Sequence, residues 1–228
     1  MMKKFKYFLA FILMSAIMVT LGACGGNAGN GEASQNEPEV NPEPTVTAQE
    51  LISKGMSEDG FSYEYVLTMP NGDKTTNKMW VKAGNMRSEM ENPAGGEPIL
   101  SIVNTQENAV YVYQPETNQA IVMPMENSDV DTTSPKDYLG ASDPDNMVLS
   151  GSETFDGKEC LVYETDYEGG KGKIWIWEEY GMPLRVETVS GQDKIVVEFL
   201  NFEIGNVDNS VFLLPEGTEI IDMSSFMQ

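Results

Sequence analysis

Cys24 is the residue whose surroundings most clearly indicate a covalent modification. The chain begins with a basic head at residues 1–6, continues with an apolar run at 7–21, and carries small residues immediately before this cysteine. This order of charge, hydrophobicity and small side chains is typical of a signal peptide with its cleavage site. We therefore expect cleavage after Ala23, so that Cys24 becomes the first residue of the mature chain.

Leu21, Gly22 and Ala23, followed by Cys24, resemble the lipobox that the lipoprotein signal peptidase recognises. The resemblance implies a diacylglyceryl group on Cys24, which would anchor the chain outside the cytoplasm, on the outer face of the cell membrane or in the outer membrane of a diderm cell. Two acyl chains make such anchoring stable, whereas one chain binds marginally. An uncleaved transmembrane helix is the alternative, but the apolar run is shorter than the roughly 20 residues that span a bilayer.

The rest of the chain offers few groups for catalysis, because it contains no histidine and only one further cysteine, Cys160. Triads that use histidine, His-ligated zinc and acid–base catalysis by imidazole are therefore excluded. Cys160 lies in a strand-like run at 159–163, which predicts a buried apolar role, and no disulfide is expected within the chain. A hydrolase that uses carboxylates alone is the remaining enzymatic alternative. We expect a protein that is not an enzyme and has no cofactor.

The charge of the chain restricts its partners. Asp and Glu number 36 against 14 Lys and Arg, which gives a formal net charge of −22. An acidic surface repels phosphate backbones, so nucleic acid is not an expected partner. Two acidic loops, at 126–131 and 143–146, lack the residue spacing of a calcium loop, and no metal site is expected.

The composition divides the chain into three segments. Residues 1–23 are the predicted signal peptide, and residues 24–47 are the lipidated cysteine followed by an acidic tether with almost no large apolar side chain. Such a tether cannot bury enough surface to offset its conformational entropy, so we expect it to be disordered. Residues 48–228 are expected to form one mainly β domain.

Within this domain, local patterns predict one amino-terminal helix and a series of strands. The helix at 47–57 has Thr47 as its N-cap and Glu50 at the capping-box position. A second short helix is expected around 135–139. Period-2 alternation and turn residues predict about eleven strands, at 61–69, 75–83, 86–91, 99–104, 109–114, 119–123, 147–155, 158–166, 171–178, 184–190 and 194–201. The short connections predict antiparallel neighbours.

Several strands are apolar on both faces, as in the runs at 173–177 and 195–200. An open sheet with one face in water would show polar residues at every second position. We therefore expect a curved antiparallel sheet with short helices packed on its concave face. A two-sheet sandwich is the alternative.

Several motifs resemble those of LolA/LolB-like domains. The runs at 79–87 and 111–117 resemble two hairpins of that family, and the runs at 157–160, 173–176, 181–184 and 207–217 keep its order and spacing. The resemblance covers roughly residues 48–224. It implies an unclosed half-barrel of about eleven strands whose apolar cavity holds acyl chains. This chain departs from the soluble carrier of that family in its own lipid anchor and its greater acidity.

Two functions of different classes follow from these observations. The first is a membrane-anchored binding protein that holds an acyl chain, lipid or lipoprotein in the half-barrel. The second is a non-catalytic envelope sensor that has a filled core and binds a protein partner. In the first case, the side chains predicted to line the cavity are Phe61, Tyr63, Tyr65, Leu67, Met79, Val81, Trp175, Trp177, Leu184, Val186, Val197 and Phe199. The sequence does not determine on which face of the sheet these side chains lie, because a shift of one residue in register reverses the face.

Overall fold

The computed structural model describes residues 46–92, 95–127, 133–167 and 170–223. The predicted signal peptide, the lipobox with Cys24, and the predicted tether up to residue 45 lie outside the described residues, as does most of the acidic loop at 126–131. In the described ranges, neither helix is long and apolar enough to cross a membrane.

Twelve strands of the described chain form one sheet. Their bounds are β1 Phe61–Thr68, β2 Lys74–Lys82, β3 Asn85–Met90, β4 Ile99–Asn104, β5 Ala109–Gln114, β6 Gln119–Pro124, β7 Val148–Phe155, β8 Lys158–Tyr167, β9 Gly170–Trp177, β10 Pro183–Ser190, β11 Asp193–Ile204 and β12 Glu219–Asp222. Each of the eleven predicted strands is present. The structure adds β12, which sequence reasoning missed.

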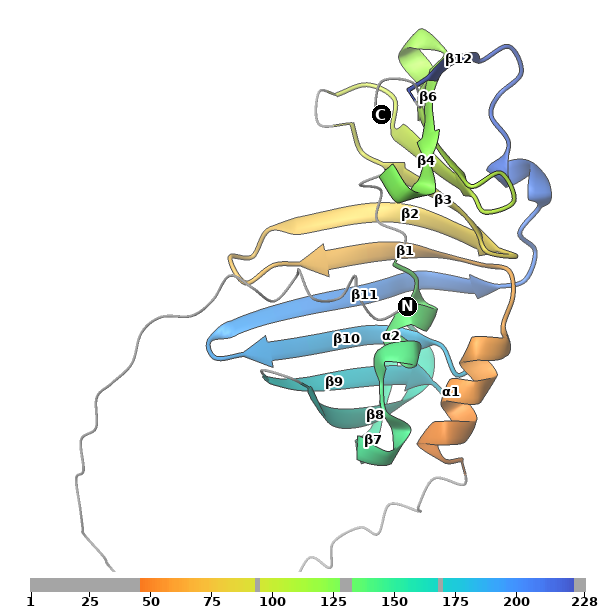
Figure 1. Ribbon diagram of the computed structural model, residues 1–228. Helices are drawn as coiled ribbons and strands as arrows, with labels where there is room; N and C mark the ends of the chain where they lie inside the picture. The colour runs from red at the N-terminus through yellow and green to blue at the C-terminus, as the bar shows by residue number, and fades with distance from the viewer. Residues whose placement is uncertain (1–45, 93–94, 128–132, 168–169, 224–228) are drawn as a thin grey trace, which may run out of the picture. The chain divides into compact units, whose positions relative to one another are not determined.

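The strand order across the sheet is β12-β6-β5-β4-β3-β2-β1-β11-β10-β9-β8-β7. The sheet is curved and unclosed, with β12 and β7 at its two edges (Figure 1). Neighbouring strands among the eleven predicted ones are antiparallel, as expected, whereas β12, which was not predicted, runs parallel to β6 at one edge. The fold class is confirmed: the structure is an unclosed, curved sheet with two short helices.

Helix α1, Ala48–Ser57, begins where its sequence predicts. The Thr47 hydroxyl accepts a hydrogen bond from the backbone N–H of Glu50 at 3.2 Å, and the Glu50 carboxylate accepts one from the N–H of Thr47 at 2.8 Å. This reciprocal capping box satisfies donors that the first helical turn leaves unpaired. Leu51 and Ile52 then pack against β8 and β9.

Helix α2, Pro135–Ala141, lies between β6 and β7, the strands at opposite sides of the sheet. The chain therefore has to cross the sheet here. The Asp137 carboxylate accepts hydrogen bonds from the backbone N–H and the hydroxyl of Ser134, which fixes the start of the helix. Leu139 is fully buried in the cluster that also contains Leu51 of α1. We call the face that these helices cover the inner face of the sheet.

The outer face of β3–β5 is covered by the chain that follows β11. Val207 and Phe212 pack on Ile102, and Leu214 packs on a neighbouring cluster around Tyr113. Two cations of the sheet hold this segment in place. The Lys82 ammonium donates to the Val207 carbonyl at 2.6 Å, and the Arg87 guanidinium donates to the Val211 carbonyl at 3.1 Å.

Short 3₁₀ helices complete the described chain: Pro115–Thr117, Met125–Asn127, Pro144–Asn146 and Asn209–Phe212. The last of these lies in the segment that leads to β12. That strand has four exposed residues, which is why it shows no alternation from which it could have been predicted.

The contact between α1 and the turn that joins β9 to β10 has no room for a side chain. A Cβ atom added to Gly55 would lie 2.2 Å from the Gly181 carbonyl oxygen, and one added to Gly181 would lie 2.1 Å from the Leu51 carbonyl oxygen. Both obstacles are backbone atoms, which cannot rotate away. Glycine at these positions lets the helix approach the sheet closely enough to bury Leu51.

Gly55→Ala is expected to reduce the free energy of unfolding by about 1–3 kcal/mol, the usual cost of overpacking a close contact. Gly140→Ala in α2 is the matched control, since no atom lies within 4 Å of the added Cβ and its backbone is helical. This control is expected to be neutral or to stabilise by up to about 1 kcal/mol. Urea unfolding curves measure both. Equal effects of the two substitutions would contradict the proposed contact.

Candidate functional site

On the inner face of β1–β6, side chains that lie opposite one another on neighbouring strands form a regular array. We divide it into three rows that run across the strands. Row one contains Phe61, Val81, Met86, Val103, Val110 and Met123. Row two contains Tyr63, Met79, Ser88, Ser101, Val112 and Ile121. Row three contains Tyr65, Asn77, Met90 and Ile99.

No side chain in the three rows carries a charge at neutral pH. The outer face of β1–β3 is different: Lys78 lies opposite Glu64 on one side and opposite Glu89 on the other. Because successive residues of a strand point to opposite faces, the sheet separates charge from apolar surface. In a chain of net charge −22, an uncharged face that extends over six strands favours an apolar ligand.

Polarity and exposure change from row one to row three. Row one is wholly apolar, and Val103 and Val110 are only 3% and 1% exposed. Row two contains the two serines, and row three contains Asn77 and Met90, the latter 40% exposed. The array is therefore closed and apolar at one end and open and partly polar at the other.

The other half of the inner face is filled by the protein itself. Leu51 of α1 and Leu139 of α2 are fully buried against β8 and β9. At the border with β1, the Phe199 ring lies 5.7 Å from the Tyr138 ring of α2 and 5.3 Å from the Tyr63 ring. The helices thus cover the β8–β11 half, in front of the sheet in Figure 1, and not the rows of β2–β6.

Every residue of the predicted cavity belongs to one hydrophobic cluster, either as a buried member or packed against it: Phe61, Tyr63, Tyr65, Leu67, Met79, Val81, Trp175, Trp177, Leu184, Val186, Val197 and Phe199. The strand register places Trp175 on the opposite face of the sheet from Val186 and Val197. Trp175 pairs with Arg185, whereas Val186 pairs with Val197 on the inner face, so Trp175 lies on the outer face. Its indole N–H donates to the Glu153 carboxylate at 2.9 Å.

Sequence reasoning missed the inner-face residues of β3–β6. They include Met86, Ser88, Ser101, Val103, Val110 and Met123. A usable signal was present in β3, where the uncharged residues Met86, Ser88 and Met90 alternate with Arg87 and Glu89. This alternation was not recognised as an inner face, because the serines interrupt the apolar pattern that is typical of a buried face.

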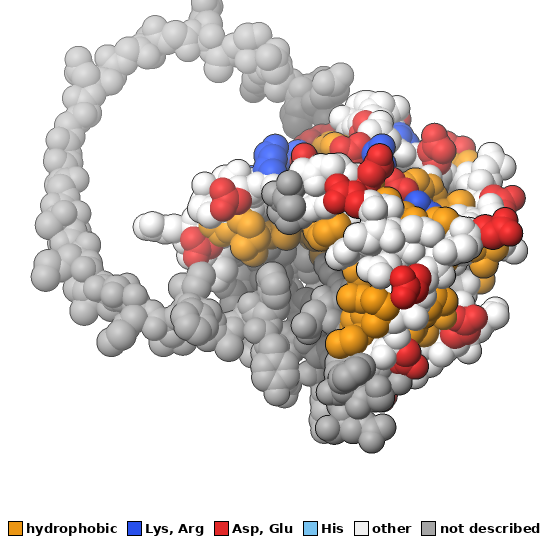
Figure 2. All heavy atoms as spheres, turned by 90° about the horizontal axis from the view of Figure 1, so that it is seen from above, with side chains coloured by type: hydrophobic (Ala, Val, Ile, Leu, Met, Phe, Trp, Pro, Cys, Tyr) orange, Lys and Arg blue, Asp and Glu red, His pale blue; other side chains and the backbone are white. Residues whose placement is uncertain are grey.

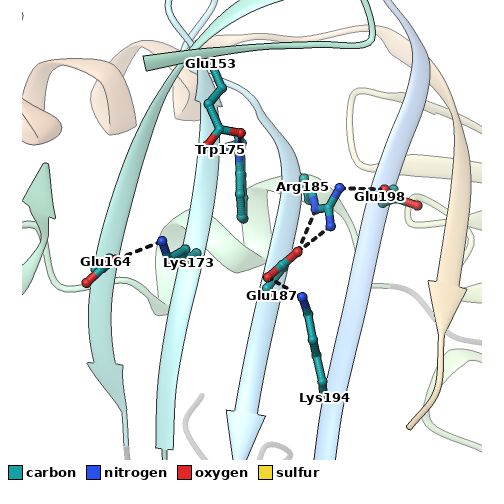
Figure 3. A network of polar contacts seen from close by, with 8 residues as sticks. All are labelled: Glu153, Glu164, Lys173, Trp175, Arg185, Glu187, Lys194 and Glu198. Carbon is teal, nitrogen blue, oxygen red and sulfur yellow. Dashed lines mark hydrogen bonds and ion pairs between the residues drawn. The ribbon is translucent and has the colours of Figure 1, made fainter. Parts of the chain in front are cut away.

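The outer face of β8–β11 carries a network of ion pairs (Figure 3). Arg185 pairs with Glu187 and, at 3.2 Å, with Glu198, while Lys194 pairs with Glu187 at 2.8 Å. Burial acts to raise the pKa of Glu187, but hydrogen bonds from Lys194 and Arg185 outweigh it and hold this pKa below its usual value. The network is structural in character, since every charge in it has a partner.

Two open hollows lie on the outer face. One, of about 340 Å³, includes Glu164, Lys173 and Val189 in its lining. The other, of about 290 Å³, includes Glu64, Lys78 and Glu89. Neither is lined by a residue of the predicted cavity. Seen from above, Asp and Glu side chains are spread over the surface and hydrophobic side chains gather in separate groups (Figure 2).

Groups suited to catalysis are scarce in the described part of the chain. Cys160 is 1% exposed, and burial raises the pKa of its thiol to about 12, so the reactive thiolate does not form near neutral pH. The buried apolar role predicted for this residue is confirmed. Among the described residues, no three His, Cys, Asp or Glu side chains gather closely enough to hold a metal ion.

The fold is similar to that of solved structures, whereas no protein-family model and no curated protein sequence matches the chain. An uncharacterised conserved protein from Thermus thermophilus aligns with 77% of this chain and 98% of its own at 15% identity, with a TM-score of 0.50. MucB in complex with MucA(peri) aligns at 12% identity over 76% of this chain and 62% of its own, with a TM-score of 0.49.

A LolA superfamily protein, NE2245 from Nitrosomonas europaea, aligns at 14% identity over 74% of this chain and 98% of its own, with a TM-score of 0.34. Identities at this level show similarity of fold alone. The first of the three alignments supports the architecture described above.

Proposed function

We propose that this protein is a membrane-anchored extracytoplasmic lipoprotein that binds an apolar ligand, an acyl chain, lipid or lipoprotein, on the inner face of β1–β6. The observation that carries the proposal is the three-row array, which is uncharged across six strands, while the outer face of β1–β3 carries Glu64, Lys78, Arg87 and Glu89. The part of this non-polar surface that is still in water, such as Met90 at 40% exposed, gains free energy when a ligand covers it, by about 25 cal/mol per Å².

The side chains of the array suit ligands of variable shape. Met79, Met86, Met90 and Met123 lie within it. Methionine is unbranched and flexible, and its thioether is polarizable, so it adapts to irregular apolar partners. Binding without chemical conversion is the role that we propose, because the array contains no acid, base or nucleophile beyond neutral hydroxyl and amide groups.

The anchor would place this array close to its ligands. Diacylated Cys24 would hold the chain at the membrane, and the predicted tether would let the domain move away from the lipid surface. A flexible segment of this length has a typical reach on the order of 25–30 Å. An acidic domain is also repelled by anionic headgroups, which would keep it in the aqueous phase between binding events.

A non-catalytic sensor with a protein partner is the second candidate. It is favoured by the filled β8–β11 half of the inner face and by the exposed edge strand β12, where Ile220 is 54% exposed. An edge strand offers unpaired backbone groups to an extended peptide. Capture of a partner by the acidic surface would weaken with salt, which distinguishes this candidate from apolar binding.

Met90→Glu is expected to weaken binding of the uncharged probe Nile red about tenfold, or ~1.4 kcal/mol, because the ligand would have to desolvate a carboxylate. Met56→Glu on α1 is the control, since Met56 is similarly exposed, at 47%, but lies outside the array. The control should change the affinity less than twofold. Fluorescence titration measures both, and equal affinities for the two variants would count against a site on the inner face.

Cys24→Ser is expected to abolish incorporation of radiolabelled palmitate when the full chain is produced in a bacterium that processes lipoproteins. The variant should also be lost from the membrane fraction as a mature lipidated species, because oxygen replaces the sulfur that receives diacylglycerol. Cys160→Ser is the control and should keep both the label and the membrane location. Persistent labelling of the Cys24→Ser protein would exclude the proposed anchor.

A further inference from the structure

We infer that the ligand of the inner face is a single-chain amphiphile with an uncharged, hydrogen-bonding head, of the acylglycerol type. Its chain lies over the half-buried residues Val112 and Ile121 of row two and Ile99 of row three, and its head contacts Ser88, Ser101 and Asn77. This inference rests on the proposed function and specifies the ligand class of the same site. It is based on the polar groups of rows two and three, which apolar binding alone does not explain.

The two serines form a directly paired site in the centre of the array. Ser88 of β3 lies opposite Ser101 of β4, between Met79 on one side and Val112 on the other. Both are half-buried, and no hydrogen bond joins either hydroxyl to another described residue. Each hydroxyl can donate one hydrogen bond and accept two, so the pair can serve a diol or an ester without any charge.

Asn77 adds an acceptor beside this pair. It lies in row three, between Tyr65 and Met90, and its Oδ1 atom is buried without a hydrogen-bond partner among the described residues. An amide oxygen that is buried and unpaired costs free energy, by about 1–3 kcal/mol. A hydroxyl or amide N–H of a bound ligand would recover that free energy. The array therefore favours a head that donates hydrogen bonds.

The charges around the array disfavour an ionised head. The three rows contain no cation or anion. Lys82 and Arg87 donate to backbone carbonyls on the outer face. Lys136 of α2, whose ammonium lies 5.7 Å from the Phe61 ring in row one, donates to the backbone carbonyls of Met56 and Glu58. A carboxylate or ammonium group that enters without a partner loses its hydration and gains no ion pair. An uncharged head loses much less and gains the serine and asparagine contacts.

The dimensions of the array also fit one chain. Six strands spaced by about 4.8 Å extend over roughly 24 Å, and rows one to three extend over about 14 Å along the strands. One lipid chain spans about half of a hydrocarbon core of ~30 Å. A single extended chain can therefore lie across the half-exposed parts of rows two and three, beside the serines and Asn77.

Displacement of Nile red from the full-length protein by three ligands with the same oleoyl or oleyl chain tests the inference. Monooleoylglycerol is expected to displace the probe at a concentration at least tenfold lower than oleate or oleylamine at pH 7.4, each below its aggregation limit. The double variant Ser88→Ala/Ser101→Ala should raise the concentration of monooleoylglycerol required by about tenfold, and that of oleate by less than twofold.

Two further variants complete the test. Ser62→Ala/Thr76→Ala, which removes hydroxyls from the outer face of β1 and β2, should leave all three ligands unchanged. Asn77→Asp places an anion in row three and should improve displacement by oleylamine at least tenfold relative to monooleoylglycerol. Equal displacement by oleate and monooleoylglycerol, or no effect of the Ser88/Ser101 variant, would overturn the inference while leaving apolar binding intact. Absence of Nile red binding would overturn the proposed function itself.

Discussion

Every side chain of a single sheet has to lie on one of its two faces, because successive residues of a strand alternate. In this protein each face is covered over a different half of the sheet. Helices α1 and α2 cover the inner face of β8–β11, and the segment after β11 covers the outer face of β3–β5. The two remaining regions are unlike: the outer face of β10 and β11 carries the paired charges of Arg185, Glu187 and Lys194, whereas the inner face of β1–β6 carries no charge and is exposed only toward row three. This difference is the physical basis of the proposed site.

The position of the helices determines which half stays open. Gly55 and Gly181 allow α1 to touch the turn between β9 and β10. Lys136 of α2 donates to the backbone carbonyls of Met56, at 3.1 Å, and of Glu58, so it joins the two helices at the end of α1. Since β6 and β7 lie at opposite sides of the sheet, the chain has to cross the inner face, and it does so over the half that α1 already covers.

Local sequence patterns predicted much of this architecture. The capping box at Thr47 and Glu50 and the alternation of eleven strands are short-range features, and the structure contains each of them. Three features were not predictable in this way: the parallel position of β12, the placement of β6 and β7 at opposite sides, and the face on which Trp175 lies. All three depend on pairing between distant segments, and a shift of one residue in register would reverse a whole strand. The Ser88–Ser101 pair could not be predicted for the same reason, since its two residues lie on separate strands.

Methionine methyl NMR signals would report directly whether an apolar ligand binds on the inner face of β1–β6. The protein would be labelled with ¹³C at its methionine methyl groups and mixed with the uncharged methyl ester of a nitroxide-labelled stearic acid. Binding on the inner face would bring the nitroxide close to Met79, Met86, Met90 and Met123, so their signals are expected to broaden while that of Met56 on α1 stays sharp. Unchanged signals for the four array methionines, or equal broadening of Met56, would contradict binding on the inner face.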